Sequence, residues 1–277
     1  MTAAPEGFRR VPGAGGRTWI LREGLPFSCE PARWDAWLAG REGRVLTREG
    51  GRAPSRVILL EGIGEAVVRR RLHGGLLAKV TRDLFAGARR PVREIEASER
   101  IRLGGVATPE ILAVYLRRPF PGLYRSCILS RLVPQSENLR QWIGGAGRDP
   151  ACWGPMLARV ARALCSLHDE GCFHRDLNLG NLLVAPAGIW ILDLDGAVMR
   201  DALAIRERGA NLLRLYRSLC KESRRKEPLS PRQRALFLRH YAQSDRRLFG
   251  DLSSYLRARW ARERLRRKVS RGRTSRP

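Results

Sequence analysis

Two short segments near the middle of the chain place three oxygen-bearing side chains where they can meet. Residues 173–184 contain Asp176 and, five positions later, Asn181, which leads directly into an apolar run. Residues 189–193 form a second apolar run that ends at Asp193. The two runs predict antiparallel strands joined by a short turn, and the ends of such strands lie side by side. We therefore expect the two carboxylates and the amide to converge on one point.

The order of these residues resembles two motifs of kinase-like phosphotransferases. His174, Asp176 and Asn181 follow the pattern H-R-D-L-x-x-x-N, and Asp193 stands where the first residue of D-F-G stands. In such enzymes, this arrangement holds ATP, Mg²⁺ and the attacking hydroxyl. The alternative is a β-hairpin that carries acidic residues by chance, which requires all four residues to fall at the right spacing without a functional reason.

The strongly basic charge is the unusual feature of the composition. The 277 residues include 53 Lys and Arg against 27 Asp and Glu, which gives a net charge of +26. Nearly all of the basic residues are arginines, so a genomic preference for arginine codons explains part of the excess. An anionic partner, such as a membrane surface or a nucleic acid, would explain the rest.

The cysteines and the hydropathy pattern limit the class of protein. The six cysteines show neither a C-x-x-C pair nor a metal-ligand spacing, which favours free thiols in a reducing compartment. No apolar run approaches the length that crosses a bilayer, and the N-terminus lacks the apolar core of a signal peptide. We expect a cytosolic protein that can bind a membrane peripherally.

The organisation of the chain changes near residue 44. Residues 1–43 are rich in Gly, Pro and Arg and predict a partly disordered extension with one packing helix at 31–39. Residues 44–133 predict three strands, a helix from about residue 90 to 103, and two further strands.

The remainder of the chain predicts a larger helical part over residues 134–269. The clearest helical periodicity runs from Trp153 to Glu170, with a stop at Gly171. Residues 270–277 predict a basic tail.

The phosphates of a nucleotide have several candidate partners in residues 44–133. Gly51 lies in a loop between two predicted strands, which suits a flap over phosphates. Arg69, near the end of the third strand, is a candidate cation, and Lys79 competes with it. Glu94 in the following helix could pair with this cation, or it could be an exposed helical glutamate. For the adenine, Ser130 and Leu132 offer backbone groups in the segment that leads to the helical part.

Three segments carry a more specific resemblance. They are Gly74-Gly75-Leu76, the loop from His174 to Asn181, and the run from Asn211 to Lys221. Together they resemble the bacterial lipopolysaccharide core kinases, most of all the 3-deoxy-D-manno-octulosonic acid (Kdo) kinases. Asn178, in place of the lysine of protein kinases, and Asp193-Leu194-Asp195, in place of D-F-G, separate this group from protein kinases.

The resemblance implies an α+β, two-lobed, protein-kinase-like fold with a small β-rich N-lobe at 44–133 and a larger helical C-lobe at 134–269. It implies ATP-dependent phosphorylation of a Kdo hydroxyl in the lipopolysaccharide inner core. Asp176 would accept the hydroxyl proton and His174 would brace the loop. Asn181 and Asp193 would hold Mg²⁺.

The same resemblance sets the expected partners. They are the Kdo–lipid A acceptor and the anionic inner face of the cytoplasmic membrane, and we expect a monomer that binds no specific nucleic acid. Two alternatives remain open. One is a kinase-like enzyme that acts on another acceptor, such as a heptose, a protein or a small molecule. The other is a basic pseudokinase that serves as a binding module.

Overall fold

The computed structural model describes residues 3–47, 54–72, 83–223 and 227–273. The chain divides into two compact units. Unit 1 comprises residues 1–103, 108–134 and 194–196, and unit 2 comprises residues 104–107, 135–193 and 197–277.

Unit 1 is built on one antiparallel sheet. Its strands are β1 (Phe8–Gly13), β2 (Arg17–Arg22), β3 (Arg44–Thr47), β4 (Ser55–Leu60), β5 (Gly64–Arg70), β6 (Phe85–Ala86), β7 (Ile111–Phe120) and β8 (Leu123–Arg131). They pair in the order β1-β2-β7-β8-β5-β4-β3, with β6 on β8. Within the described residues of the unit, the helices are α1 (Pro31–Ala39) and α3 (Arg89–Leu103).

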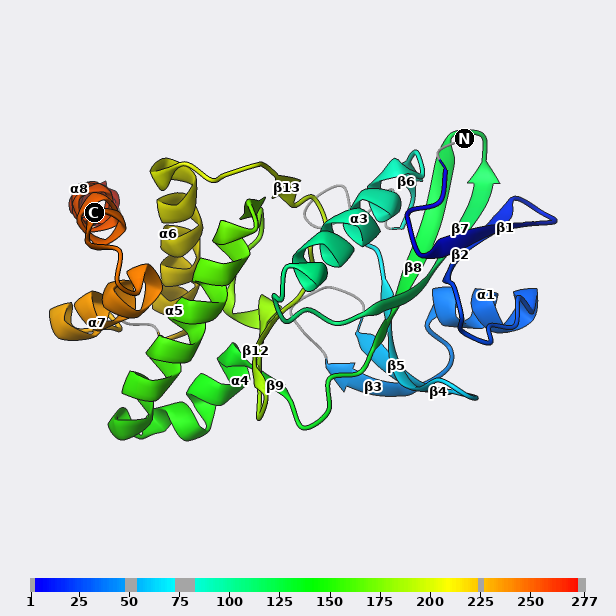
Figure 1. The fold of residues 1–277 in the computed structure, drawn as a ribbon, viewed down its shortest axis with the longest axis horizontal. Helices are drawn as coiled ribbons and strands as arrows, with labels where there is room; N and C mark the ends of the chain where they lie inside the picture. The colour runs from blue at the N-terminus through cyan, green and yellow to red at the C-terminus, as the bar shows by residue number, and fades with distance from the viewer. Residues whose placement is uncertain (1–2, 48–53, 73–82, 224–226, 274–277) are drawn as a thin grey trace. The chain divides into compact units, whose positions relative to one another are not determined.

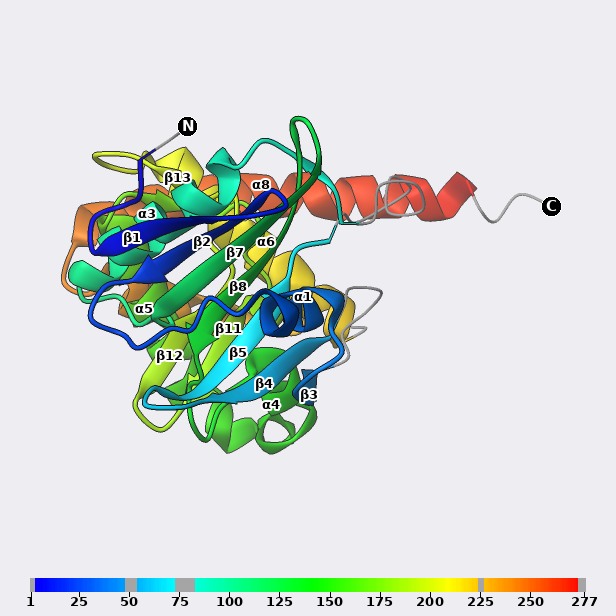
Figure 2. The ribbon, with the colours of Figure 1, turned by 90° about the vertical axis from the view of Figure 1, so that its right-hand side faces the viewer.

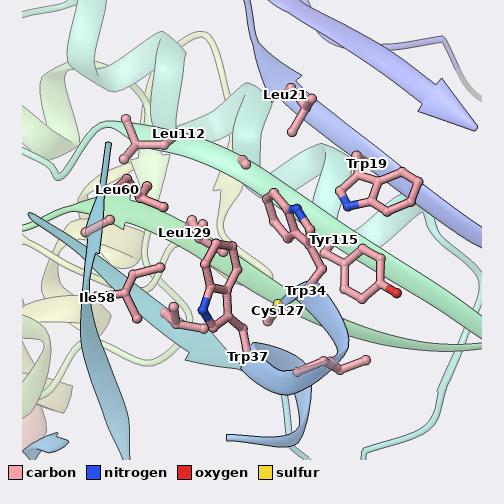
Figure 3. Packing of buried hydrophobic residues seen from close by; sticks show 14 residues of the cluster. Trp19, Leu21, Trp34, Trp37, Ile58, Leu60, Leu112, Tyr115, Cys127 and Leu129 are labelled. Atoms are coloured by element: carbon pink, nitrogen blue, oxygen red, sulfur yellow. The ribbon is translucent and has the colours of Figure 1, made fainter. Parts of the chain in front are cut away.

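The core of unit 1 lies on both faces of this sheet, because successive side chains of a strand point to opposite faces. On β2, Trp19 packs on the face that carries α1, whereas its neighbour Ile20 packs on the face of α3, beside Ile95. Figure 3 shows the first of these clusters, in which Trp34 of α1 lies against Trp19 and Tyr115. The sheet is thus covered on both sides.

Residues 1–43 differ from the partly disordered extension that the sequence predicts. β1 and β2 extend the sheet beyond β7, and α1 packs onto it. Asp35 of α1 accepts a hydrogen bond from the Tyr115 hydroxyl at 2.6 Å and forms an ion pair with Arg17 at 2.8 Å. Burial raises the pKa of Asp35, but hydrogen bonds from Tyr115 and Arg17 outweigh burial and hold this pKa below its usual value. This segment is therefore an integral part of unit 1.

Unit 2 is mainly helical (Figure 1). Its helices are α4 (Leu139–Gly144), α5 (Trp153–Asp169), α6 (Ile205–Glu222), α7 (Pro231–Ala242) and α8 (Arg246–Arg273), with short turns η1 (Ala146–Arg148), η2 (Pro150–Cys152) and η3 (Leu179–Asn181). α5 packs against α7, and α6 packs against α8.

Two small sheets complete unit 2. One has the strand order β12-β11-β9, and the other pairs β10 with β13. The strands are β9 (Glu137–Asn138), β10 (Cys172–Phe173), β11 (Leu182–Ala185), β12 (Gly188–Ile191) and β13 (Val198–Met199).

Local sequence explains where two of these helices begin or end. At α4, the side chains of Asn138 and Gln141 accept hydrogen bonds from each other's backbone N–H groups at 2.9 and 3.0 Å, which is a capping box. α5 ends before Gly171, whose φ of +72° favours glycine. A Cβ atom at Gly171 would also overlap the backbone carbonyl oxygen of Arg200. Glycine is therefore required where the chain passes from α5 into β10.

α8 runs from Arg246 to Arg273, so it extends past residue 269, where the predicted helical part ends. Its first half packs on the unit through buried Leu252 and Leu256. Its second half extends away from the other helices of unit 2 (Figure 2). Among the described helices, none combines the length and the apolar character needed to cross a bilayer.

Candidate active site

The predicted hairpin brings Asn181 and Asp193 to the same end of two strands in unit 2. β11 and β12 pair antiparallel, with Leu182 opposite Ile191. The N–H of Leu192 donates to the carbonyl oxygen of Asn181 at 2.9 Å, so the pairing continues one residue past the strands. Asp193 follows immediately. Strand register therefore brings the backbones of these two residues close together.

Side chains of the loop that carries Asp176 form hydrogen bonds to the backbone carbonyl group of Asp176. The side-chain amides of Asn178 and Asn181 both donate to the Asp176 carbonyl oxygen, at 2.9 and 2.8 Å. Asn178 also accepts a hydrogen bond from the N–H of Gly180 at 2.8 Å. The two asparagines thus fix the backbone around Asp176, whose side chain stays partly accessible.

His174 joins the two chain segments that carry the candidate carboxylates. Its Nε2 lies 2.9 Å from the carbonyl oxygen of Leu192, and its Nδ1 lies 3.2 Å from the backbone nitrogen of Asp176. A carbonyl only accepts and an N–H only donates, so His174 is the neutral tautomer with its proton on Nε2. Burial lowers the pKa of His174, which favours the same neutral state. The bracing role predicted for His174 therefore has a definite geometry.

Asp193 has an unusual backbone conformation. Its φ is +58°, in the left-handed region that most non-glycine residues avoid. Aspartate and asparagine tolerate this region better than other side chains. Such conformations cost on the order of 1–3 kcal/mol and concentrate at functional sites, which supports a functional role for Asp193.

The residues at this end of the hairpin fit a Mg²⁺ ion. Asn181 uses its amide nitrogen to bond Asp176, which leaves its side-chain oxygen as the group for a cation. Asp193 adds a carboxylate from the neighbouring segment. Magnesium prefers hard oxygen ligands and is commonly held by one or two protein groups together with phosphate oxygens. The donor set is therefore of the right chemical class.

In unit 1, Arg69 of β5 forms an ion pair with Glu94 of α3. Glu94 is buried, with a relative exposure of 3%, while the Arg69 side chain remains 31% exposed. A buried carboxylate requires a cationic partner. The alternative of an exposed helical glutamate is therefore wrong, and the pairing predicted for Glu94 is confirmed with Arg69 as the partner. Lys79 and Gly51 lie outside the described residues.

The two predicted adenine contacts are partly engaged in the sheet of unit 1. Ser130 of β8 pairs with Val67 on one side and with Ile111 on the other. The N–H of Leu132 donates to the carbonyl oxygen of Glu65 at 3.1 Å. A contact from Leu132 to an adenine would therefore use its carbonyl group and not its N–H.

Comparison with known proteins assigns the chain to a family. Residues 38–241 match the model of the "Lipopolysaccharide kinase (Kdo/WaaP) family", which is most of the chain. The chain belongs to this family. It is thus a kinase that phosphorylates a sugar hydroxyl of the lipopolysaccharide core, as the motif resemblance predicts.

Two curated relatives match this lipopolysaccharide kinase over most of their length. A 3-deoxy-D-manno-octulosonic acid kinase of Xylella fastidiosa (strain 9a5c) is 34% identical over 215 residues, which cover 72% of this chain and 82% of the relative. A protein of the same name from Xanthomonas campestris pv. campestris (strain B100) is 32% identical over 208 residues, which cover 73% and 77%.

A solved structure gives the same answer for the fold of this kinase. The structure described as "WaaP in complex with acyl carrier protein" has a TM-score of 0.57 and 23% identity, and the match covers 88% of this chain and 97% of that chain. The predicted two-lobed, kinase-like α+β fold is therefore confirmed.

Sequence reasoning missed several residues that hold the motifs of this kinase in place. Asp195, the last residue of the D-L-D segment, forms ion pairs with Arg71 at 2.7 Å and with Arg90 at 2.8 Å, all within unit 1. In unit 2, Asn211 of α6 contacts the backbone of His174. The run that begins at Asn211 carried part of the family resemblance, and this was the available signal for its importance.

Proposed function

We propose that this chain transfers the γ-phosphoryl group of ATP to a hydroxyl of Kdo in the lipopolysaccharide inner core, with Asp176 as the base. One observation in unit 2 carries the proposal: His174 ties the backbone at Asp176 to the segment that ends at Asp193, beside Asn181. The names of the 34% and 32% identical relatives support Kdo as the acceptor.

Each residue of this set has a separate role. The Asp176 carboxylate accepts a hydrogen bond from the sugar hydroxyl and takes its proton as the oxygen bonds to the γ-phosphorus. The bond from the γ-phosphorus to the bridging oxygen breaks, and ADP leaves. Neutral His174 does not exchange protons. It orients Asp176 through the backbone N–H of that residue.

Cations would neutralise the negative charge of the ATP phosphates. Mg²⁺ held by Asn181 and Asp193 would neutralise the phosphate oxygens as charge develops on them. Arg69, fixed by Glu94, is the cation that we assign to the ATP phosphates, with Lys79 as its competitor. Gly51 remains the candidate for a phosphate flap, and Ser130 and the Leu132 carbonyl remain candidates for the adenine.

The decisive test is Mg²⁺-dependent transfer of labelled γ-phosphate from ATP to a Kdo–lipid A acceptor. Asp176→Asn, which keeps the shape of the side chain, should abolish transfer. The matched control Asp201→Asn alters an exposed aspartate of the same unit and should leave transfer intact. Transfer that survives Asp176→Asn would refute the assigned base. If the wild type binds ATP but transfers no phosphate to Kdo–lipid A, the acceptor would be a heptose, a protein or a small molecule. Absence of ATP binding would favour the pseudokinase.

We also propose that the kinase binds the anionic inner face of the cytoplasmic membrane through α8. This helix carries eleven basic residues and two acidic ones, and Arg257 and Arg259 are exposed on its described part. Each arginine near an anionic surface contributes about 1 kcal/mol. Charge reversal of Arg257 and Arg259 should weaken sedimentation with anionic vesicles. Equal loss on reversing exposed Arg41 and Arg118 of unit 1 would indicate a nonspecific effect of net charge.

An apolar pocket in unit 2 is a candidate binding site for a second partner. It encloses about 700 Å³ including its open mouth, and its walls come from α4 to α8. Among the lining residues are Trp142, Met156, Leu157, Leu215, Phe237 and Trp260. Because the structural neighbour was solved with acyl carrier protein, we propose that the pocket receives an acyl chain from such a carrier. Affinity for acylated carrier should rise with chain length, since each buried CH₂ contributes about 0.8 kcal/mol. An affinity for acylated carrier that does not change with acyl-chain length would exclude the pocket as the binding site of the chain.

A further inference from the structure

One line of residues on α6 runs along the loop that carries the proposed base. Asn211 bonds the backbone of His174 at 3.0 Å, and Ser218 Oγ accepts a hydrogen bond from the backbone N–H of Leu179 at 3.2 Å. Because these two helix positions are two turns apart, they share a face and are separated by about 10 Å along the axis. Asp176 lies between His174 and Leu179 in the sequence. The loop segment that contains the base therefore follows α6 over two turns.

A row of cations borders this line on the solvent side. Arg214 and Lys221 each follow one residue of the line by three positions, so they lie on the neighbouring strip of the helix surface. Arg217 falls between them, and all three side chains are exposed. On the other side of the line are buried leucines, namely Leu212, Leu215 and Leu219. We call the exposed set Arg214, Arg217 and Lys221 the basic stripe.

The acidic residues of α6 do not neutralise the ends of the basic stripe. Glu207 pairs with Arg200 at 2.8 Å, and Glu222 pairs with Arg140 at 2.9 Å. Within the part of the chain that the structure describes, Arg214 and Lys221 have neither a hydrogen-bond partner nor an ion-pair partner in their side chains. Two cations beside the loop of the base are thus available to a negatively charged molecule.

We propose that the basic stripe binds anionic groups of the acceptor and so brings the sugar hydroxyl to Asp176. The inference rests on the proposed function and deepens it, because it gives the acceptor a binding surface. The carboxylate of an octulosonic acid and the phosphates of lipid A share the chemistry that guanidinium and ammonium groups recognise, namely negatively charged oxygens. Because Arg214 and Lys221 are about 10 Å apart along the helix axis, each can bind a separate group.

The double variant Arg214→Gln/Lys221→Gln tests this surface in the transfer assay with Kdo–lipid A. The KM for the acceptor should rise about tenfold for each substitution, because each removes a charge-assisted hydrogen bond. The kcat and the KM for Mg-ATP should stay within about twofold of wild type, because uniform binding of the acceptor is all that is lost. A rise in the KM for Mg-ATP instead would assign the stripe to the nucleotide and overturn the proposal.

α7 offers a matched control. Arg232 and Arg239 are exposed, belong to the same unit and have the same seven-residue spacing as Arg214 and Lys221. Arg232→Gln/Arg239→Gln therefore removes the same charge from another helix and should keep the wild-type KM for the acceptor. An equal rise in this control would show a general effect of net charge and refute the stripe. An unchanged KM in the α6 double variant would show a solvated basic face and also refute it.

Modified acceptors identify the group that is bound. One has its Kdo carboxylate amidated, and the other lacks the lipid A phosphates. If the stripe binds the carboxylate, amidation should raise the KM of the wild type about tenfold and leave that of the α6 double variant unchanged, because the interaction is already absent there. The same comparison with the second acceptor identifies the phosphates. Losses that add fully for both acceptors would refute the proposal.

Binding of Kdo–lipid A to Asp176→Asn separates this proposal from the proposed function. If the wild type transfers no phosphate but Asp176→Asn binds the acceptor, and this binding weakens with Arg214→Gln/Lys221→Gln, the basic stripe stands and the proposed reaction fails. If the wild type transfers phosphate and the α6 double variant has the same KM for the acceptor, the proposed function stands and the role of the stripe is refuted.

Discussion

Acid should destabilise this kinase through protonation of the buried histidine His168. His168 is fully buried, and burial lowers its pKa to about 4. The groups that face it are Tyr241, which bonds its Nδ1, the Arg208 guanidinium, the Asp169 carboxylate and the neutral ring of His174. A proton on Nδ1 of His168 would remove the acceptor of the Tyr241 hydroxyl and add a charge near Arg208.

The magnitude follows from linkage between protonation and folding. An unfolded chain has a histidine pKa of about 6.5, so the folded state lowers it by about 2.5 units, or about 3 kcal/mol at 1.36 kcal/mol per unit. Because the folded pKa is depressed, the unfolded state binds the proton first. The contribution of neutral His168 is therefore complete above about pH 6.5 and is lost progressively as the pH falls toward about 4.

Urea unfolding at pH 7.5 and pH 4.5 measures this contribution. His168→Gln can still donate to Asn211 and cannot be protonated, so its free energy of unfolding should fall less between these pH values, by about 2–3 kcal/mol, than that of wild type. Carboxylates with lowered pKa values, such as Asp35 and Glu99, lose stabilisation in both proteins and cancel in the difference. His240→Gln on α7 is the control. Parallel pH dependences of wild type and His168→Gln would refute the reasoning.

Three other substitutions probe the site and the fold. Asp193→Asn should keep its thermal midpoint, because asparagine also tolerates a positive φ, and should lose phosphoryl transfer in the same assay. Gly171→Ala should lower the free energy of unfolding by on the order of 2–4 kcal/mol in urea titration, because it adds backbone strain and a clash with the Arg200 carbonyl. Trp34→Ala should cost about 3–5 kcal/mol, measured in the same way. A near-neutral Trp34→Ala would mean that residues 1–43 contribute little to unit 1.

The elements with strong periodicity were predictable from the sequence. The helix expected at 153–170 is α5 (Trp153–Asp169), and the apolar runs around Asn181 form β11 and β12. Residues 1–43 were not predicted as part of the sheet. Their many Gly, Pro and Arg residues obscure the strand that contains Trp19 and Ile20. These two side chains point to opposite faces of the sheet, and this strand is stabilised by its tertiary pairing with β7.

The supporting residues of the site were harder to predict, because their partners lie far away in sequence. Asn211 forms hydrogen bonds with the backbone of His174, 37 positions earlier. Because every residue has the same backbone groups, the sequence does not indicate which of them a distant side chain contacts. Arg71 and Asp195 are 124 positions apart. Asp176, Asn181 and Asp193 could be proposed as candidates from the sequence because their spacing within one loop and one hairpin is local.

The arginine at position 69 has a consequence for chemical labelling. Guanidinium groups stay protonated and are poor nucleophiles, whereas lysine amines can be acylated. If Arg69 serves the nucleotide phosphates, an ATP analogue with an amine-acylating group on its phosphate end would find no reactive amine at that strand. The lysines of the chain are Lys79, Lys221, Lys226 and Lys268. Acylation of Lys79 that ATP prevents would show that this amine also approaches the phosphates. Absence of this acylation would leave Arg69 as the cation, and the kinase would then resist inactivation by the amine-acylating ATP analogue.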